Sequence, residues 1–290
     1  MSQVLSSERF ITDDGVTLHY LEAGRKHTNG PVLVFLPGWT LSASGFRHQL
    51  SGLSNHYRCV ALDYRSHGLS ECPDHGYRVS RFAQDVNNLL SHAQIEQAVF
   101  VAHSAGCAVA WSFLELFGQE RLKALVLCDQ MIARLKRPGW TEEQCRQFGA
   151  SVGGDQAVTE AQTLSGPEGT ETMRSFLESM FTPRCPAGDR SGIIESSLNV
   201  PRNNAVRLLL DVTFSDYRDL LPKINLPTLC IGGHASHLGP DVMPYIASQI
   251  PRATLKMISV EEGGSHFMFA ENPPLFNEWL SAFLHSQLSR

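Results

Sequence analysis

Short apolar runs recur along the chain in a pattern typical of a parallel β-sheet. The runs are bounded by glycine, proline or polar residues, and the continuous run Pro31–Leu36 is of the kind that a strand buried on both faces needs. Between the runs, Val79–His92 and Ala105–Phe117 show the spacing of amphipathic or buried helices. The alternation predicts an α/β fold in which a mostly parallel sheet is flanked by helices. The predicted strands are Pro31–Leu36, Arg58–Leu62, Ala98–Ala102, Leu122–Cys128, Thr228–Ile231 and Ala253–Ser259.

The two ends of the chain add elements of other kinds. Phe10–Glu22 has strand alternation on both sides of an Asp-Gly turn, which predicts an antiparallel hairpin on one edge of the sheet. The last apolar stretch, after His266, has helical spacing and predicts a closing helix. Its apolar positions are Phe276, Trp279, Leu280 and Phe283.

The strand–helix rhythm is lost between Ile132 and about Tyr217 and then returns. This segment holds helical patches such as Glu171–Phe181, separated by Gly- and Pro-rich stretches. We interpret it as a helical lid, residues 132–217, inserted into a core formed by residues 1–131 and 218–290. Gly153-Gly154 lacks the strand–helix context of a phosphate-binding loop, and we interpret it as a hinge of the lid.

Composition narrows the possible partners. The 290 residues carry a net charge of −5 without a basic stretch, so no nucleic-acid partner is expected. No apolar run approaches the length of a membrane span, and residues 1–9 lack the pattern of a signal peptide. We therefore expect a cytoplasmic protein, not bound to a membrane, that acts on a small molecule. The oligomeric state is left open.

The seven cysteines and the histidines give no sign of a metal site or cofactor. Cys59, Cys107, Cys128 and Cys230 lie in or beside apolar segments, which favours reduced thiols in the core. His234 and His237 are three residues apart, with no third or fourth ligand nearby in the sequence. We expect neither a metal nor a cofactor.

A serine interrupts the most apolar of these runs. The stretch Ala98–Ala108 reads as a strand, a corner at Ser104 and a helix. A serine at such a corner has a strained backbone that lifts its hydroxyl above the sheet edge, next to the N-terminus of the helix. Strand and helix crowd together there, so small residues are needed two positions before and after the serine. Ala102 and Gly106 meet this requirement.

Two further chemical groups follow predicted strands. Asp129 ends the strand Leu122–Cys128, and His266 follows the last strand. Doubly wound sheets place their active sites at the carboxyl ends of the strands. A serine hydroxyl becomes a useful nucleophile when an imidazole takes its proton, and a carboxylate fixes the tautomer of that imidazole. The order Ser104, Asp129, His266 therefore predicts a catalytic triad.

Five ordered motifs resemble the α/β-hydrolase superfamily: Pro37–Trp39, Asp63–Ser70, Ala102–Gly106, Pro227–Gly233 and Gly264–His266. The resemblance implies the α/β-hydrolase fold, with Ser104, Asp129 and His266 as catalytic residues. It also implies that the backbone N–H groups of Trp39 and Ala105 form an oxyanion hole, where negative charge develops on the attacked carbonyl oxygen.

The position of the acid departs from the usual pattern of the superfamily. Most members carry the aspartate after the strand that here ends at Ile231, but this chain has Gly233-His-Ala-Ser236 there. Asp129 lies one strand earlier, at a position that the superfamily also uses. We predict that Asp129 orients His266, with Asp241 as the alternative acid.

The resemblance predicts a serine hydrolase that cleaves a carboxylic ester, lactone or thioester through an acyl-enzyme. Aromatic and sulfur-containing side chains of the lid favour a small apolar or aromatic substrate. His103 is expected to pack beside the nucleophile. The predicted pocket residues are Leu41, His103, Trp140, Phe176 and Met180.

An alternative hypothesis assigns a different reaction to a protein of the same fold. The early acid and the Pro-Gly-Trp turn also resemble cofactor-free 2,4-dioxygenases of 3-hydroxy-4-quinolones, in which a His/Asp pair deprotonates the substrate. That family has histidines where this chain has Leu41 and Ala105, which disfavours it. A haloperoxidase-like esterase would share the Trp but usually keeps the later aspartate. A non-catalytic binding protein would be signalled by a broken triad, and the triad here is intact.

Overall fold

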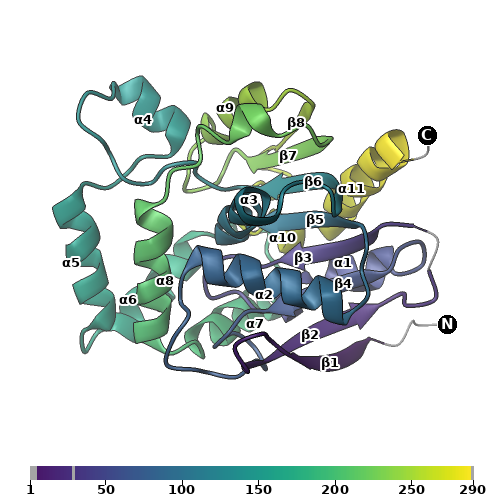
Figure 1. The fold of residues 1–290 in the computed structure, drawn as a ribbon. Coiled ribbons are helices and arrows are strands. Elements are labelled where there is room, and N and C mark those ends of the chain that lie inside the picture. The colour runs from purple at the N-terminus through teal and green to yellow at the C-terminus, as the bar shows by residue number, and fades with distance from the viewer. Residues whose placement is uncertain (1–4, 28–29, 289–290) are drawn as a thin grey trace.

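The computed structural model describes residues 5–27 and 30–288. In these ranges eight strands form one sheet in the order β1-β2-β4-β3-β5-β6-β7-β8 (Figure 1). The β1–β2 and β2–β4 pairs are antiparallel, and all other neighbours are parallel. The strands are β1 Ser6–Ile11, β2 Thr17–Ala23, β3 Val32–Leu36, β4 Cys59–Asp63, β5 Ala98–His103, β6 Leu122–Cys128, β7 Thr228–Gly233 and β8 Ala253–Ile258.

Helices cover both faces of this sheet, and each face has its own apolar core. Helices α2 (Val79–His92), α3 (Ala105–Phe117) and α9 (Val242–Gln249) contribute to one core. The other core contains side chains of α1 (Arg47–Leu53), α10 (Met268–Glu271) and α11 (Pro273–Leu288). Short 3₁₀ turns lie at Ala43–Phe46 and Leu221–Lys223. The predicted α/β-hydrolase fold is confirmed.

Five consecutive helices between β6 and β7 form the inserted cap. They are α4 Glu142–Phe148, α5 Gly154–Ser165, α6 Gly169–Ser179, α7 Ala187–Leu198 and α8 Arg202–Phe214. Figure 1 shows α4, α5, α6 and α8 on the side of the molecule opposite the two chain ends, whereas α7 lies at the lower edge of the view, nearer the middle. An isolated β-bridge joins Ala133 to Asp216 at the base of the insertion, close to the predicted lid limits 132 and 217.

Polar contacts fasten the α6–α7 half of the cap to the core. The Glu271 carboxylate in α10 is buried and accepts a hydrogen bond from the backbone N–H of Thr182 at 2.7 Å. In α7, Asp189 is 2.8 Å from His48 and also pairs with Arg47, both in α1. Within the described ranges, no helix is both long and apolar enough to cross a membrane.

Limited proteolysis should distinguish a mobile lid from a rigid one. The segment from Lys136 to Gly139 is exposed, whereas the chain near Thr182 is held by Glu271. We expect trypsin to cut the native protein first after Lys136, because mobile exposed turns are the preferred sites of cleavage. Sequencing of the first fragments measures this. First cuts within the core strands themselves would contradict the lid hypothesis.

Candidate active site

Ser104 occupies a strained corner between β5 and α3. Its φ of 52° and ψ of −128° lie outside the usual regions for a residue with a side chain. The Ser104 N–H donates to the Cys128 carbonyl at 2.9 Å, which ties the corner to β6. A Cβ atom on Gly106 would lie 2.2 Å from the Leu36 carbonyl oxygen. The close approach of α3 to β3 therefore requires glycine at this position, in agreement with the sequence argument.

Asp129 and His266 meet at the carboxyl end of the sheet. Asp129 follows β6, and its Oδ2 lies 2.6 Å from Nδ1 of His266, with both side chains buried. Asp241, the alternative acid, is half exposed at the start of α9, 3.6 Å from Arg146. The structure thus brings Asp129, and not Asp241, to His266.

Ser236, which stands where most members of the superfamily carry the acid, contacts Asp129. Ser236 Oγ accepts the N–H of Leu238 at 3.1 Å and donates to Asp129 Oδ2 at 2.5 Å. The same carboxylate oxygen therefore receives hydrogen bonds from Ser236 and His266. These bonds hold the carboxylate in one orientation.

The loops that carry Ser236 and His266 are joined to each other. The Ala235 N–H donates to the Gly264 carbonyl at 2.8 Å. A Cβ atom on Gly233 would lie 2.0 Å from that carbonyl oxygen, so the two loops approach as closely as their backbones allow. His266 is thereby placed by backbone contacts as well as by Asp129.

Burial dominates the electrostatics of the pair. It raises the pKa of Asp129 to about 6, and the hydrogen bond from Ser236 is the largest contribution in the opposite direction. Burial lowers the pKa of His266 below its usual value. At neutral pH a neutral imidazole therefore faces the cavity while the Asp129 carboxylate remains ionised. This is the protonation state that a general base needs.

The turn after β3 lies against the serine. A Cβ atom on Gly38 would be 2.9 Å from the Ser104 Cβ, and Trp39 follows directly. Ala105 is the first residue of α3, where backbone N–H groups lack acceptors within the helix. Trp39 and Ala105 both line the same cavity as Ser104, so the predicted oxyanion donors are near the serine.

A cavity of about 1080 Å³ separates the sheet edge from the cap, and Ser104 and His266 line it. Phe176 of α6 is 39% exposed and forms part of its roof, between the rings of Trp39 at 6.4 Å and His237 at 5.8 Å. Trp140 and Met180 also line the cavity, as predicted. Further lining residues are Gln130, Met131, Arg134, Glu160, Leu209, Val212 and Leu238.

Two predicted pocket residues are placed elsewhere. Leu41 turns back from the wall into the apolar core beside Gly45, because the chain reverses after Trp39 into the 3₁₀ turn. His103 points away from the cavity, and its Nε2 donates to the His266 carbonyl at 2.9 Å. Burial lowers the pKa of His103 well below its usual value, so His103 is neutral where it packs behind His266.

Sequence reasoning missed His237 and Gln130 as cavity residues. The sequence marks His237 only through its spacing from His234, yet the ring centroids of His237 and His266 lie 4.6 Å apart. Gln130 is 3% exposed and directly follows Asp129. The available signal was that Gln130 directly follows Asp129, and that His237 directly follows Ser236 at the usual acid position. Among the described residues, no three Cys, His, Asp or Glu side chains converge as a metal site requires.

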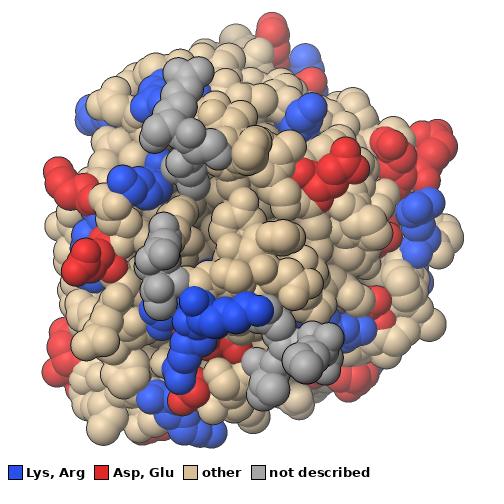
Figure 2. Space-filling model, turned by 90° about the vertical axis from the view of Figure 1, so that its right-hand side faces the viewer, with Lys and Arg blue, Asp and Glu red and all other residues tan. Residues whose placement is uncertain are grey.

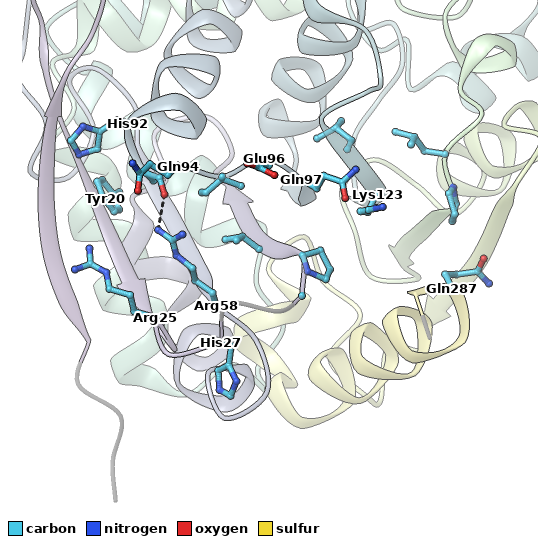
Figure 3. Close-up of a pocket in the computed structure, with 18 of the residues that line it drawn as sticks. Tyr20, Arg25, His27, Arg58, His92, Gln94, Glu96, Gln97, Lys123 and Gln287 are labelled. Atoms are coloured by element: carbon cyan, nitrogen blue, oxygen red, sulfur yellow. Dashed lines mark hydrogen bonds between the residues drawn. The ribbon is translucent and has the colours of Figure 1, made fainter. Parts of the chain in front are cut away.

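A second hollow, of about 1240 Å³, lies at the opposite edge of the sheet, at the amino ends of the parallel strands. Lys and Arg are interspersed with Asp and Glu over the face that bears the chain ends (Figure 2). Figure 3 shows Arg25 and Arg58 in the hollow. Both pair with Glu22, and Arg58 also donates to the Ala93 carbonyl at 3.0 Å. Arg25 also pairs with Glu8, so two carboxylates balance these two cations, and no serine is among the described residues that line this hollow.

The fold and the site together define the class of protein. Residues 31–273 match the family model of the alpha/beta hydrolase fold, and the chain belongs to this family.

Individual relatives within the family differ in their chemistry. The chain is 28% identical over 288 residues to the non-heme chloroperoxidase CPO-A1 of Kitasatospora aureofaciens, covering 94% of this chain and 98% of that protein. The crystal structure of a bromoperoxidase from Bacillus anthracis matches with a TM-score of 0.84 at 21% identity, covering 96% and 99% of the two chains. An esterase from Exiguobacterium antarcticum matches with a TM-score of 0.83 at 22% identity, covering 95% and 98%. The likeness to these two structures shows the fold.

Proposed function

We propose that this hydrolase cleaves a carboxylic ester, lactone or thioester through an acyl-enzyme formed on Ser104. The observation that carries the proposal is the Asp129–His266 contact of 2.6 Å, at the edge of a cavity that also exposes Ser104. A buried neutral imidazole that is oriented by a carboxylate and lines the same cavity as a serine is an arrangement suited to activating a hydroxyl for acyl transfer.

Each group has a defined role in the proposed reaction. His266 takes the proton from Ser104 as the serine oxygen bonds to the carbonyl carbon, and the N–H groups of Trp39 and Ala105 stabilise the oxyanion. His266 then gives the proton to the leaving alcohol or thiol. Water, deprotonated by His266, releases the acid and restores Ser104. Asp129 remains ionised and stabilises the imidazolium.

The cavity walls support a small apolar or aromatic substrate. Trp39, Trp140 and Phe176 line the same cavity as Ser104, and Met180 adds a flexible apolar side chain to its wall. Such walls favour acyl or alcohol groups without charge. A panel of esters with increasing acyl length tests the proposal, run beside an oxygen-uptake assay on 3-hydroxy-4-quinolones. Oxygen uptake without hydrolysis of any ester would refute it.

The pH profile should follow the Asp129–His266 pair as a unit. Proton uptake by the pair removes the base, so kcat/KM should fall as the pH drops through about 6, the pKa to which burial raises Asp129. Ser236→Ala removes the hydrogen bond that most opposes this rise, so the acid limb should move to higher pH. The measurement is kcat/KM from about pH 4.5 to about pH 9. An acid limb in Ser236→Ala that stays in place or moves lower would contradict this.

A further inference from the structure

Two polar side chains line the cavity without a hydrogen-bonding partner. In the part of the chain that the structure describes, no group hydrogen bonds to the ring nitrogens of His237 or to the side-chain amide of Gln130. Gln130 is 3% exposed, and His237 is open to the cavity. The polar atoms of both side chains are absent from the set of buried, unpaired atoms of the described residues, so they reach the space of the cavity. They are therefore available to hydrogen bond to a bound ligand.

The two side chains start from one place in the fold. Gln130 follows Asp129, and His237 follows Ser236, and these preceding residues are linked by the 2.5 Å hydrogen bond. Gln130 and His237 therefore leave neighbouring strand ends, β6 and β7. The Gln130 side-chain amide can both donate and accept hydrogen bonds, and so can the neutral imidazole of His237.

The position of His237 relative to His266 shows which half of the substrate it would contact. Its ring meets that of His266 edge-on, with centroids 4.6 Å apart and planes at 73°. The leaving group departs toward His266, because that imidazole gives it a proton. The space beside His237 therefore belongs to the alcohol half of the substrate, whereas the oxyanion turn at Trp39 marks the other side.

We infer that His237 and Gln130 are specificity-determining residues that hydrogen bond to a hydroxyl, carbonyl or amide group in the leaving half of the substrate. The inference rests on the proposed function and makes it more specific. The preferred ester, lactone or thioester then has an apolar part against Trp140, Phe176 and Met180, and a polar group close to the scissile bond.

Paired substrates test this directly. The 2-hydroxyethyl ester and the propyl ester of the same acid have nearly the same size, and they differ in one terminal hydroxyl. We expect His237→Phe, which keeps an aromatic ring against His266 and Phe176, to lower the ratio of kcat/KM for the hydroxyethyl over the propyl ester about five- to tenfold. Gln130→Met, which keeps length and removes the amide, should lower the same ratio.

Matched variants separate recognition from packing. His237→Asn keeps a hydrogen-bonding side chain and should hold the ratio within about twofold of the wild type. Met180→Leu changes an apolar wall and should change both esters by the same factor. An unchanged ratio in both His237→Phe and Gln130→Met overturns the inference, whether the two rates persist or fall together. If the wild type hydrolyses no ester at all, the proposed function itself fails, which is a distinct result.

Discussion

Ser104→Ala should reduce ester hydrolysis by at least about 10⁴-fold, to the background left by substrate binding and the oxyanion donors. In the proposed mechanism the serine oxygen becomes bonded to the acyl carbon, so no neighbouring group can replace it. Alanine removes one oxygen atom, and the corner keeps its backbone contact with Cys128. We therefore expect the thermal unfolding midpoint to stay close to that of the wild type. The measurement is kcat/KM on the best ester of the panel.

The same variant separates hydrolysis from cofactor-free oxygenation. In an oxygenase His266 deprotonates the substrate itself, and the serine only hydrogen bonds, so Ser104→Ala would retain much of the oxygen uptake. A fluorophosphonate should label the wild type once, at Ser104, because the oxyanion donors fit its tetrahedral adduct. Labelling alone does not distinguish the two chemistries. Undetectable ester turnover in the wild type, with oxygen uptake retained in the variant, would refute the hydrolase assignment.

The second large effect is expected at Asp129. Asp129→Asn should lower kcat/KM about 10³- to 10⁴-fold, because an amide leaves His266 in the wrong tautomer and does not stabilise the imidazolium. Asn is nearly isosteric with Asp, so packing at the end of β6 is preserved. The loss should therefore appear in turnover and leave the fold unchanged.

Asp241 provides a matched control for this substitution. Asp241→Asn changes a half-exposed carboxylate at the start of α9 that faces Arg146. Exposed pairs of this kind contribute little to stability, and this one lies away from the base. Near-wild-type turnover is expected. Equal losses in Asp129→Asn and Asp241→Asn, or a loss in Asp241→Asn alone, would show that the acid is misassigned.

Local patterns in the sequence were sufficient for most of the core. α2, α3 and β6 begin and end where the apolar spacing predicted, because each buries a face that must be continuous in sequence. Helices α1 and α9 were not predicted. They are only 7 and 8 residues long, too short to show a clear helical period, and packing on the sheet stabilises them.

Contacts between distant segments were less accessible from the sequence. Asp129 could be predicted as the acid because the usual acid position holds Ser236 and has no carboxylate. Asp129 ends the preceding strand, and the carboxyl ends of parallel strands lie along the same edge of the sheet. The inward position of Leu41 depends on how the chain reverses after Trp39, and the burial of His103 depends on the His266 loop, 163 residues away. His237 has its position because the loops after β7 and β8 meet. No local sequence pattern predicts the contact between these two loops.

Ser104 and Asp129, the proposed nucleophile and acid, both precede the cap in the chain and follow the adjacent strands β5 and β6. In the more usual arrangement, the acid would follow the inserted helices. Here the cap enters and leaves through the Ala133–Asp216 bridge, after Ser104 and Asp129 are already set relative to each other. Segments of different length or sequence could therefore be exchanged at this junction during evolution, or grafted from relatives, changing the substrate without disturbing the spacing of these two residues.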